Sequence, residues 1–424
     1  MQRWAVLLHL NNMKSLLTFV AGIMSVRLAV ILLSLAQTTL WAAVLGLDAF
    51  GITSAYLGAQ AMASLLGRLG SDNLIVRDYK RDPLFCAHFP GFLVAVAGMS
   101  LVAGLTVLAV VTLLVFRTWQ GPESVVFVLF VIGFNLSLVL SRIMIARKQP
   151  TLASFLSNAL PMAISTGLFA VAAPALDRLP ISGPTLAIGF FAVGHYFAAL
   201  TSAIWLRGFL RDCLRERRAN PQRVRILFGP EQWYFLGYQS MGMARSHGVT
   251  LAIAAIFGPT ATGVFALANR FGGLLTYLNE PARLFTMPRV ADKSMEQVRR
   301  LYFRMLWLNA ALGITGIAFL IGLYLLVSPP FPTDPPFPLY TLIIMAGAAF
   351  NLFVGPVGII LAMSGNERNN FFANIVGLVL VIGCIALAAM TDTVVIAVIS
   401  VAASSVVINL INILKLLKIM RGSQ

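Results

Sequence analysis

The chain has 424 residues, of which 59% are hydrophobic and 11% charged, and its formal net charge is +16. Soluble domains are about 45–50% apolar and about 25% charged, so this composition excludes a soluble globular enzyme and a disordered chain. A membrane-spanning helix needs roughly 20 apolar residues. The chain is therefore expected to be an all-α polytopic membrane protein with almost no extramembrane domain.

Apolar runs separated by polar residues, Gly or Pro predict about twelve transmembrane helices. Helices are expected because lipid cannot satisfy an open backbone, and runs such as 101–115 lack the alternation of barrel strands. The first run is too long for the core of a signal peptide and is expected to be retained. The predicted spans cover 15–45, 52–70, 86–115, 124–145, 151–174, 185–206, 232–257, 261–283, 305–327, 339–363, 371–390 and 393–414.

Lysines and arginines are concentrated in alternate loops. With twelve spans, 26 of the 31 basic residues lie at the termini or in the even-numbered loops, and only Arg117 and Arg178 lie in the others. The positive-inside rule then places both termini and the even-numbered loops in the cytoplasm. Because this charge distribution is normal for inner loops, no nucleic-acid partner is expected.

Several features recur at a spacing of half the chain length. The outer turns after the first and seventh predicted spans each carry two glycines, and a basic residue follows the next span in both halves. The matching pairs are Gly46 and Gly258, Gly51 and Gly263, and Arg77 and Arg289. With six spans on either side, these pairs predict a duplicated six-helix unit whose copies share one orientation. Transporters built from such parallel repeats carry substrate between the halves by alternating access.

A basic segment, 207–231, separates the two predicted six-helix lobes, which cover residues 1–206 and 232–424. Its apolar residues fall at helical spacing between arginines, which predicts an amphipathic helix on the anionic inner leaflet. Membrane lipids are therefore expected partners. The apolar positions are Phe209, Leu210, Cys213 and Leu214.

Three arginines lie near the middle of predicted spans, where a charged side chain is costly and marks a pathway or a pair. They share helix faces as follows: Arg27 with Ser34 and Thr38, Arg245 with Tyr238, and Arg270 with Tyr277. No carboxylate lies at their depth, and the alternative is that they snorkel or bind helix carbonyls. We infer a cationic cavity between the halves, made mainly by helices 1 and 7, whose guest is an anion, because arginine binds phosphate with a planar fork of donors.

Other reactive side chains suggest no catalytic site. His195 and His247 also lie deep in spans, either as proton relays or as hydrogen-bonded core residues. The cysteines Cys86, Cys213 and Cys384 lack the spacing of a zinc site or a disulfide framework and are expected to be small apolar residues. No metal, nucleotide or nucleophile motif is present, so no cofactor and no catalytic residue is expected.

Two stretches carry a family resemblance. The first, 45–77, combines Gly46-x4-Gly51 with a small-residue helix, Leu69-Gly70 and Arg77. The second, 258–288, contains Gly263 to Arg270 and two later prolines. Together they resemble the Wzx-like O-antigen and polysaccharide flippases of the multidrug/oligosaccharidyl-lipid/polysaccharide exporter superfamily, and the likeness extends to span number and duplication along nearly the whole chain.

The resemblance implies two six-helix lobes that form a V around a central cationic cavity. It implies translocation of a polyprenyl-diphosphate-linked glycan (an O-antigen, capsule or exopolysaccharide unit) across a bacterial inner membrane, with other polysaccharide-assembly proteins as partners. Arg27 matches a cavity arginine on helix 1 of the related lipid II flippases, Arg245 is a looser match, and Arg270 would be secondary.

The chain also departs from its relatives. It lacks the extra C-terminal helices of the lipid II flippases, and it lacks the mid-membrane acid with which cation-coupled drug exporters bind protons or sodium. Two alternatives stay open. One is a small-molecule exporter of the same superfamily, and the other is a membrane glycan polymerase or ligase, although the outer segment 328–338 holds a single acid and no base.

Overall fold

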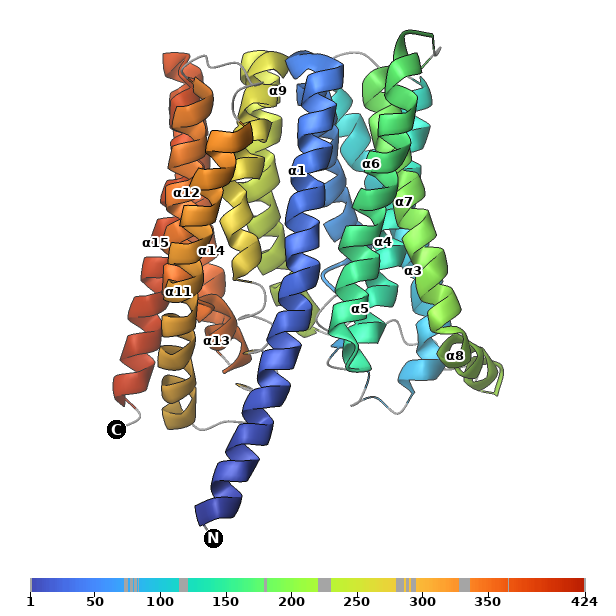
Figure 1. Cartoon of the computed structure of the whole chain (residues 1–424). Helices are drawn as coiled ribbons and strands as arrows, with labels where there is room; N and C mark the ends of the chain where they lie inside the picture. The colour runs from blue at the N-terminus through green and yellow to red at the C-terminus, as the bar shows by residue number, and fades with distance from the viewer. Residues whose placement is uncertain are drawn as a thin grey trace.

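A computed structural model of the chain shows a bundle of long helices (Figure 1). It describes residues 2–422 except for 72–74, 77, 78, 80, 81, 83, 114–120, 179, 180, 220–229, 280–285, 287–289, 291–294, 328–335 and 365. The helices of the first half are α1 (Gln2–Arg68), α3 (Phe85–Val111), α4 (Gly121–Ala146), α5 (Pro150–Ser154), η2 (Phe155–Ala159), α6 (Leu160–Ala172), η3 (Ala173–Arg178) and α7 (Gly183–Trp205). The remaining helices are α8 (Arg207–Ala219), α9 (Pro230–Leu278), α11 (Met295–Val327), α12 (Pro336–Val354), α13 (Val357–Met363), α14 (Glu367–Thr391) and α15 (Val394–Gly422).

Ten helices of the described part are long and apolar enough to cross a membrane, and two of them are long enough to cross it twice. The apolar part of α1 has 44 residues and that of α9 has 40, whereas one crossing needs roughly 20. Each is interrupted by a glycine with positive φ, Gly46 at 77° and Gly258 at 86°. The chain is thus a multi-pass membrane protein, and counting α1 and α9 as pairs confirms the predicted number of spans.

The two glycine turns touch each other, and we call this the turn contact (residues 47–51 and 259–263). A Cβ atom on Gly51 would lie 2.0 Å from the carbonyl oxygen of Pro259, and one on Gly263 would lie 2.2 Å from that of Leu47. Only glycine permits so close an approach of two backbones. The predicted glycine pairs therefore have two different tasks, since Gly46 and Gly258 turn the chain and Gly51 and Gly263 let the turns meet.

The two halves form separate groups of helices around α1 and α9, which make the most extensive helix contact (Figure 1). One buried apolar cluster, which includes Phe50 and Phe265, contains residues of both halves. Two further clusters belong to one half each, around Phe89 in the first and Val357 in the second. This arrangement is the predicted pair of lobes. The lobe bounds at 206 and 232 stay predictions, because 220–229 lie outside the described residues.

Both chain ends and α8 lie at one end of the bundle, and the turns of α1 and α9 lie at the other (Figure 1). The predicted amphipathic helix is present over Arg207–Ala219, with Cys213 fully buried on its apolar face. Cys213 forms a disulfide with Cys86 of α3, and their Cα atoms are 4.5 Å apart. The prediction of three isolated cysteines was therefore wrong, because the packing of α8 against the start of α3 joins residues 127 positions apart.

Candidate functional site

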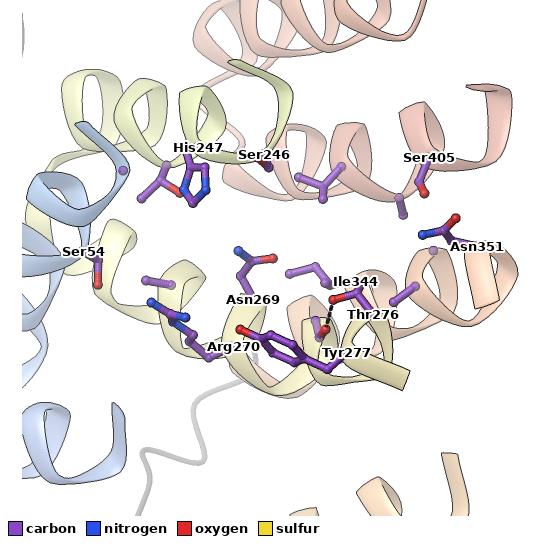
Figure 2. A pocket seen from close by; sticks show the side chains of 18 of the residues that line it. Ser54, Ser246, His247, Asn269, Arg270, Thr276, Tyr277, Ile344, Asn351 and Ser405 are labelled. Atoms are coloured by element: carbon purple, nitrogen blue, oxygen red, sulfur yellow. Dashed lines mark hydrogen bonds between the residues drawn. The ribbon is translucent and has the colours of Figure 1, made fainter. Parts of the chain in front are cut away.

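Two cavities with polar side chains lie among the helices of the second half, and the first of them is also lined by α1. The first has a volume of about 330 Å³ and lies between α9, α12, α15 and the second helix of α1. Figure 2 shows its polar side chains, with Ser54 on the side of α1 and the others on helices of the second half. The cavity is thus shared by the two halves. Its main polar residues are Ser54, His247, Asn269, Arg270, Tyr277 and Asn351.

The cationic side of the first cavity comes from the second helix of α9. Arg270 and Tyr277 are two helical turns apart, so they share one face, and both line the cavity (Figure 2). Gly273 lies between them, and a Cβ added there would meet no atom within 4 Å. The missing side chain leaves room beside the guanidinium, which offers five N–H donors and no acceptor.

The second cavity has a volume of about 220 Å³ and adjoins the first, because Thr276, Asn351 and Ser405 line both. Arg245, from the first helix of α9, lies on its wall. Most of its other polar lining consists of asparagines from α12, α14 and α15 and from the turn directly after α9. The two cavities therefore lie side by side, and we call them the joined cavities.

The charge of the joined cavities is positive. Arg270 lines one and Arg245 the other, and no Asp or Glu occurs among the described residues that line either of them. Beside protein walls, charges attract more strongly than they do in bulk water. Because arginine binds phosphate and carboxylate groups through paired N–H donors, the arrangement suits an anionic or strongly polar guest.

The predicted residues of α1 lie elsewhere. Arg27, Ser34 and Thr38 are buried, with exposed fractions of 9%, 2% and 4%, and they line neither cavity. Gln37, which neighbours Thr38, donates a hydrogen bond of 3.0 Å to Ser165 of α6. This part of α1 therefore packs against another helix of the first half. Tyr238 was predicted to share a helix face with Arg245, and its side chain lies outside the described residues.

A second buried arginine, besides Arg27, was missed. Arg68 ends α1 and is 3% exposed, although the sequence suggested a cytoplasmic loop residue. Its Nη1 donates to Asn135 Oδ1 at 2.7 Å, and Asn135 Nδ2 donates to Ser100 Oγ at 2.6 Å. The guanidinium carbon also lies 5.6 Å from the centre of the Phe134 ring. Arg68 thus stabilises the packing of the first half, and its place at the border of a span hid this role.

The two deep histidines have different surroundings. His195 is 2% exposed, lies against the rings of Phe130, Phe134 and Phe191, and has its Nδ1 3.1 Å from Ser137 Oγ. It is a hydrogen-bonded core residue of the first half. His247 lines the first cavity together with Arg270 (Figure 2).

The asparagines of the second cavity were also missed. Asn370 and Asn374 are one turn apart on α14, and Asn409 and Asn412 are nearly one turn apart on α15. Two amides one helical turn apart in a strongly apolar helix form a polar stripe on one face. Such a stripe could have been recognised in the sequence as a candidate cavity lining. That the stripes of two helices face each other depends on helix packing.

Comparison with known proteins gives matches among solved structures alone, since neither a family model nor a curated protein matches the chain. An outward-facing multidrug resistance MATE family transporter of the MOP superfamily is 15% identical with a TM-score of 0.61, and the match covers 97% of this chain and 96% of that one. The Vibrio cholerae MATE transporter VcmN, as a mutant, is 14% identical with a TM-score of 0.62, over 96% and 97%. A MOP superfamily transporter from Pyrococcus furiosus is 15% identical with a TM-score of 0.51, over 97% and 96%. At these identities the likeness establishes the fold, which is the two-lobed, V-shaped fold of MATE transporters.

Proposed function

We propose that this protein is an alternating-access transporter that moves a polyprenyl-diphosphate-linked oligosaccharide across the bacterial inner membrane. The glycan would be a repeat unit of an O-antigen, a capsule or an exopolysaccharide. The diphosphate is held by cavity arginines, the glycan occupies the polar cavities, and the lipid tail stays in the bilayer. No chemical bond changes, so the protein acts as a flippase and not as a polymerase or ligase.

The observation that carries this proposal is the charge of the joined cavities. Arg270 and Arg245 line adjoining spaces whose described lining contains no carboxylate. A diphosphate is negatively charged, and it accepts hydrogen bonds in the geometry that guanidinium groups offer. Arg27, buried on α1 in this conformation, is proposed to meet the diphosphate in another state of the cycle, when the halves separate.

The orientation belongs to the proposal. Both chain ends and α8 lie at one end of the bundle, and the basic residues of α8 favour the anionic inner leaflet. We therefore assign that end to the cytoplasm, with the turn contact on the outer side. Partners would be the lipid-linked glycan, membrane lipids and other proteins of polysaccharide assembly.

A small-molecule exporter is the second candidate, and the fold comparison by itself favours it, because matched structures are multidrug resistance transporters. The cavity argues in the other direction, since a cationic drug needs an acid that the described lining lacks. Pocket charge also differs among proteins of this fold, because the Pyrococcus furiosus transporter is described as having a binding pocket of reversed polarity that suggests a different function.

Deletion of the gene in its host, followed by mass spectrometry of the lipid extract, separates the candidates. The flippase predicts accumulation of a complete polyprenyl-diphosphate-linked repeat unit that stays on the inner leaflet. Unchanged lipids together with new drug sensitivity would establish the exporter. Accumulation of units that already face outward would indicate a polymerase or ligase.

A further inference from the structure

The second cavity is lined by an unusual number of carboxamide side chains. Its asparagines come from three helices and from the turn after α9, and they surround a space of about 220 Å³. They are Asn279, Asn351, Asn370, Asn374, Asn409 and Asn412. We call this set the asparagine cluster. Four of its members are nearly inaccessible, with exposed fractions of 5% or less, namely Asn279, Asn370, Asn374 and Asn412.

Hydrogen bonds hold the cluster in a fixed arrangement. Asn412 Nδ2 donates to Asn370 Oδ1 at 3.1 Å, and Asn374 Nδ2 donates to the Asn370 carbonyl oxygen at 2.8 Å. Asn409 Nδ2 donates to Asn351 Oδ1 at 3.0 Å. Asn370 Oδ1 also accepts from Asn374 Nδ2, Asn370 Nδ2 donates to the Gly358 carbonyl oxygen, and Asn409 Nδ2 donates a second bond to the Ser405 carbonyl oxygen. Each amide has two donor hydrogens and an oxygen with two lone pairs, so these bonds use part of the cluster's capacity and leave part of it for a ligand. Oδ1 of Asn412 is buried and has no hydrogen-bond partner among the described residues.

Most of these amides have no counterpart in the first half. At the 212-residue spacing, four of the six matching positions hold larger apolar residues, one holds a glycine and one, Asn158, holds an asparagine. The apolar matches are Val139 for Asn351, Met162 for Asn374, Phe197 for Asn409 and Leu200 for Asn412. The asparagine cluster is therefore a feature of the second half and was not simply carried over by the duplication. Buried polar groups without full hydrogen bonding are unfavourable unless a ligand completes them, so the cluster points to a polar ligand.

The chemistry of the cluster suits a neutral sugar. Neighbouring hydroxyls of a pyranose each donate and accept one or more hydrogen bonds, as carboxamides do. A hard metal ion is usually bound by carboxylate ligands, and the described lining contains none. The lining also includes the cationic Arg245, which would repel a metal ion. At about 30 Å³ per water, the volume corresponds to roughly seven water molecules, which is room for one sugar ring.

On the basis of the proposed function, we infer that the asparagine cluster binds the sugar next to the diphosphate, and that this sugar is uncharged. The sugar would reach the cluster through the junction formed by Thr276, Asn351 and Ser405, while the diphosphate stays on Arg270 and Arg245. The protein would then recognise its substrate by the first sugar, and the outer sugars would extend beyond the two cavities.

Binding to the purified full-length protein in nanodiscs tests this inference. The probes are polyprenyl diphosphate and the same lipid carrying glucose, N-acetylglucosamine or glucuronic acid. A lipid with a neutral sugar is expected to bind about tenfold or more tightly than bare polyprenyl diphosphate, because several hydrogen bonds are added. The glucuronosyl lipid is expected to show no such gain.

The variants Asn412→Leu and Asn374→Leu keep the side-chain shape and remove the amide. Each is expected to abolish the gain from the neutral sugar and to leave the affinity for bare polyprenyl diphosphate unchanged, which also shows that the variant is folded. Asn158→Leu is the matched control, because Asn158 lies at the position of the first half that corresponds to Asn370 and lines neither cavity.

The outcomes separate the two proposals. If no sugar-bearing lipid binds more tightly than bare polyprenyl diphosphate, or if both asparagine variants keep the full gain, the sugar site is wrong and the diphosphate site stands. If none of the lipids binds the wild-type protein, the proposed function falls, and the sugar site falls with it.

Discussion

Thr260 donates a hydrogen bond to Asp48, and these two residues, 212 positions apart, are themselves equivalent in the duplicated chain. The same spacing relates Gly51 to Gly263, each of which lies against a carbonyl of the opposite turn. Two equivalent segments that contact each other in this reciprocal way lie about an approximate two-fold axis. The turn contact is therefore where the two lobes meet at the end of the bundle opposite the chain termini, and alternating access requires the lobes to part there.

Joining the lobes at the turn contact is expected to stop transport. The double variant Asp48→Cys, Thr260→Cys, with the three native cysteines replaced by serine, should form a cross-link under mild oxidation and lose export of the lipid-linked glycan. Reduction should restore export, and each single cysteine variant should be active under both conditions. Full activity of the cross-linked protein would show that the turns do not separate during the cycle.

Adding a methyl group at the turn contact is expected to destabilise the protein. In Gly51→Ala and Gly263→Ala the new Cβ would lie 2.0 Å and 2.2 Å from a backbone carbonyl oxygen, well inside van der Waals contact, so the two turns must shift apart. Such overpacking typically costs about 1–3 kcal/mol. Thermal unfolding in detergent should show a lower Tm for both. Gly98→Ala is the control, because a Cβ at Gly98 of α3 meets no atom within 4 Å. Wild-type Tm values for the two turn variants would contradict the close approach.

Removing a cavity arginine is expected to weaken binding of polyprenyl diphosphate. Hydrogen bonds to charged groups contribute about 1.5–3 kcal/mol, so Arg270→Ala and Arg245→Ala should each lower the affinity about ten- to a hundredfold. Arg300→Ala is the control, because Arg300 is exposed on α11 and pairs with Glu296. If all three variants bound polyprenyl diphosphate with equal affinity, the assignment of the diphosphate site to the two cavities would be wrong.

Arg27→Ala addresses a residue that lines neither cavity in this conformation. If Arg27 meets the diphosphate only after the halves separate, the variant should abolish surface polysaccharide while its expression stays normal. Immunoblotting of the protein and of the polysaccharide in the complemented deletion strain measures both quantities. Normal surface polysaccharide would exclude Arg27 from the transport path.

The disulfide between α3 and α8 predicts the number of free thiols. Because thiols on the cytoplasmic side are kept reduced in the cell, the test uses protein purified in air. Alkylation of this protein after denaturation without a reductant should modify only Cys384, and prior reduction should raise the number to three. Cys213→Ser should free Cys86 and give two modified residues without reduction. Three modified cysteines in the unreduced wild-type protein would contradict the bond.

Much of the architecture could be predicted from the sequence alone, because it depends on local properties. A run of apolar residues in a membrane forms a helix whose backbone hydrogen bonds stay within the segment, so the spans follow from composition. Gly46 and Gly258 interrupt two of these runs, and the left-handed φ values at these positions require glycine. The amphipathic pattern within 207–231 likewise predicts the helix α8, because the pattern depends only on the local sequence.

What only the tertiary structure decided is which helix faces meet. Arg27 and Arg270 both lie near the middle of predicted spans, so the sequence does not distinguish them. In the structure Arg27 is buried away from both cavities, whereas Arg270 lines the first cavity. Asn374 and Asn412 lie on different helices, and only the packing of α14 against α15 places both on one wall. Cys86 and Cys213 are likewise joined through the docking of α8. Helical periodicity determines which residues share a face of one helix, whereas the partner of that face depends on shape complementarity between helices distant along the chain.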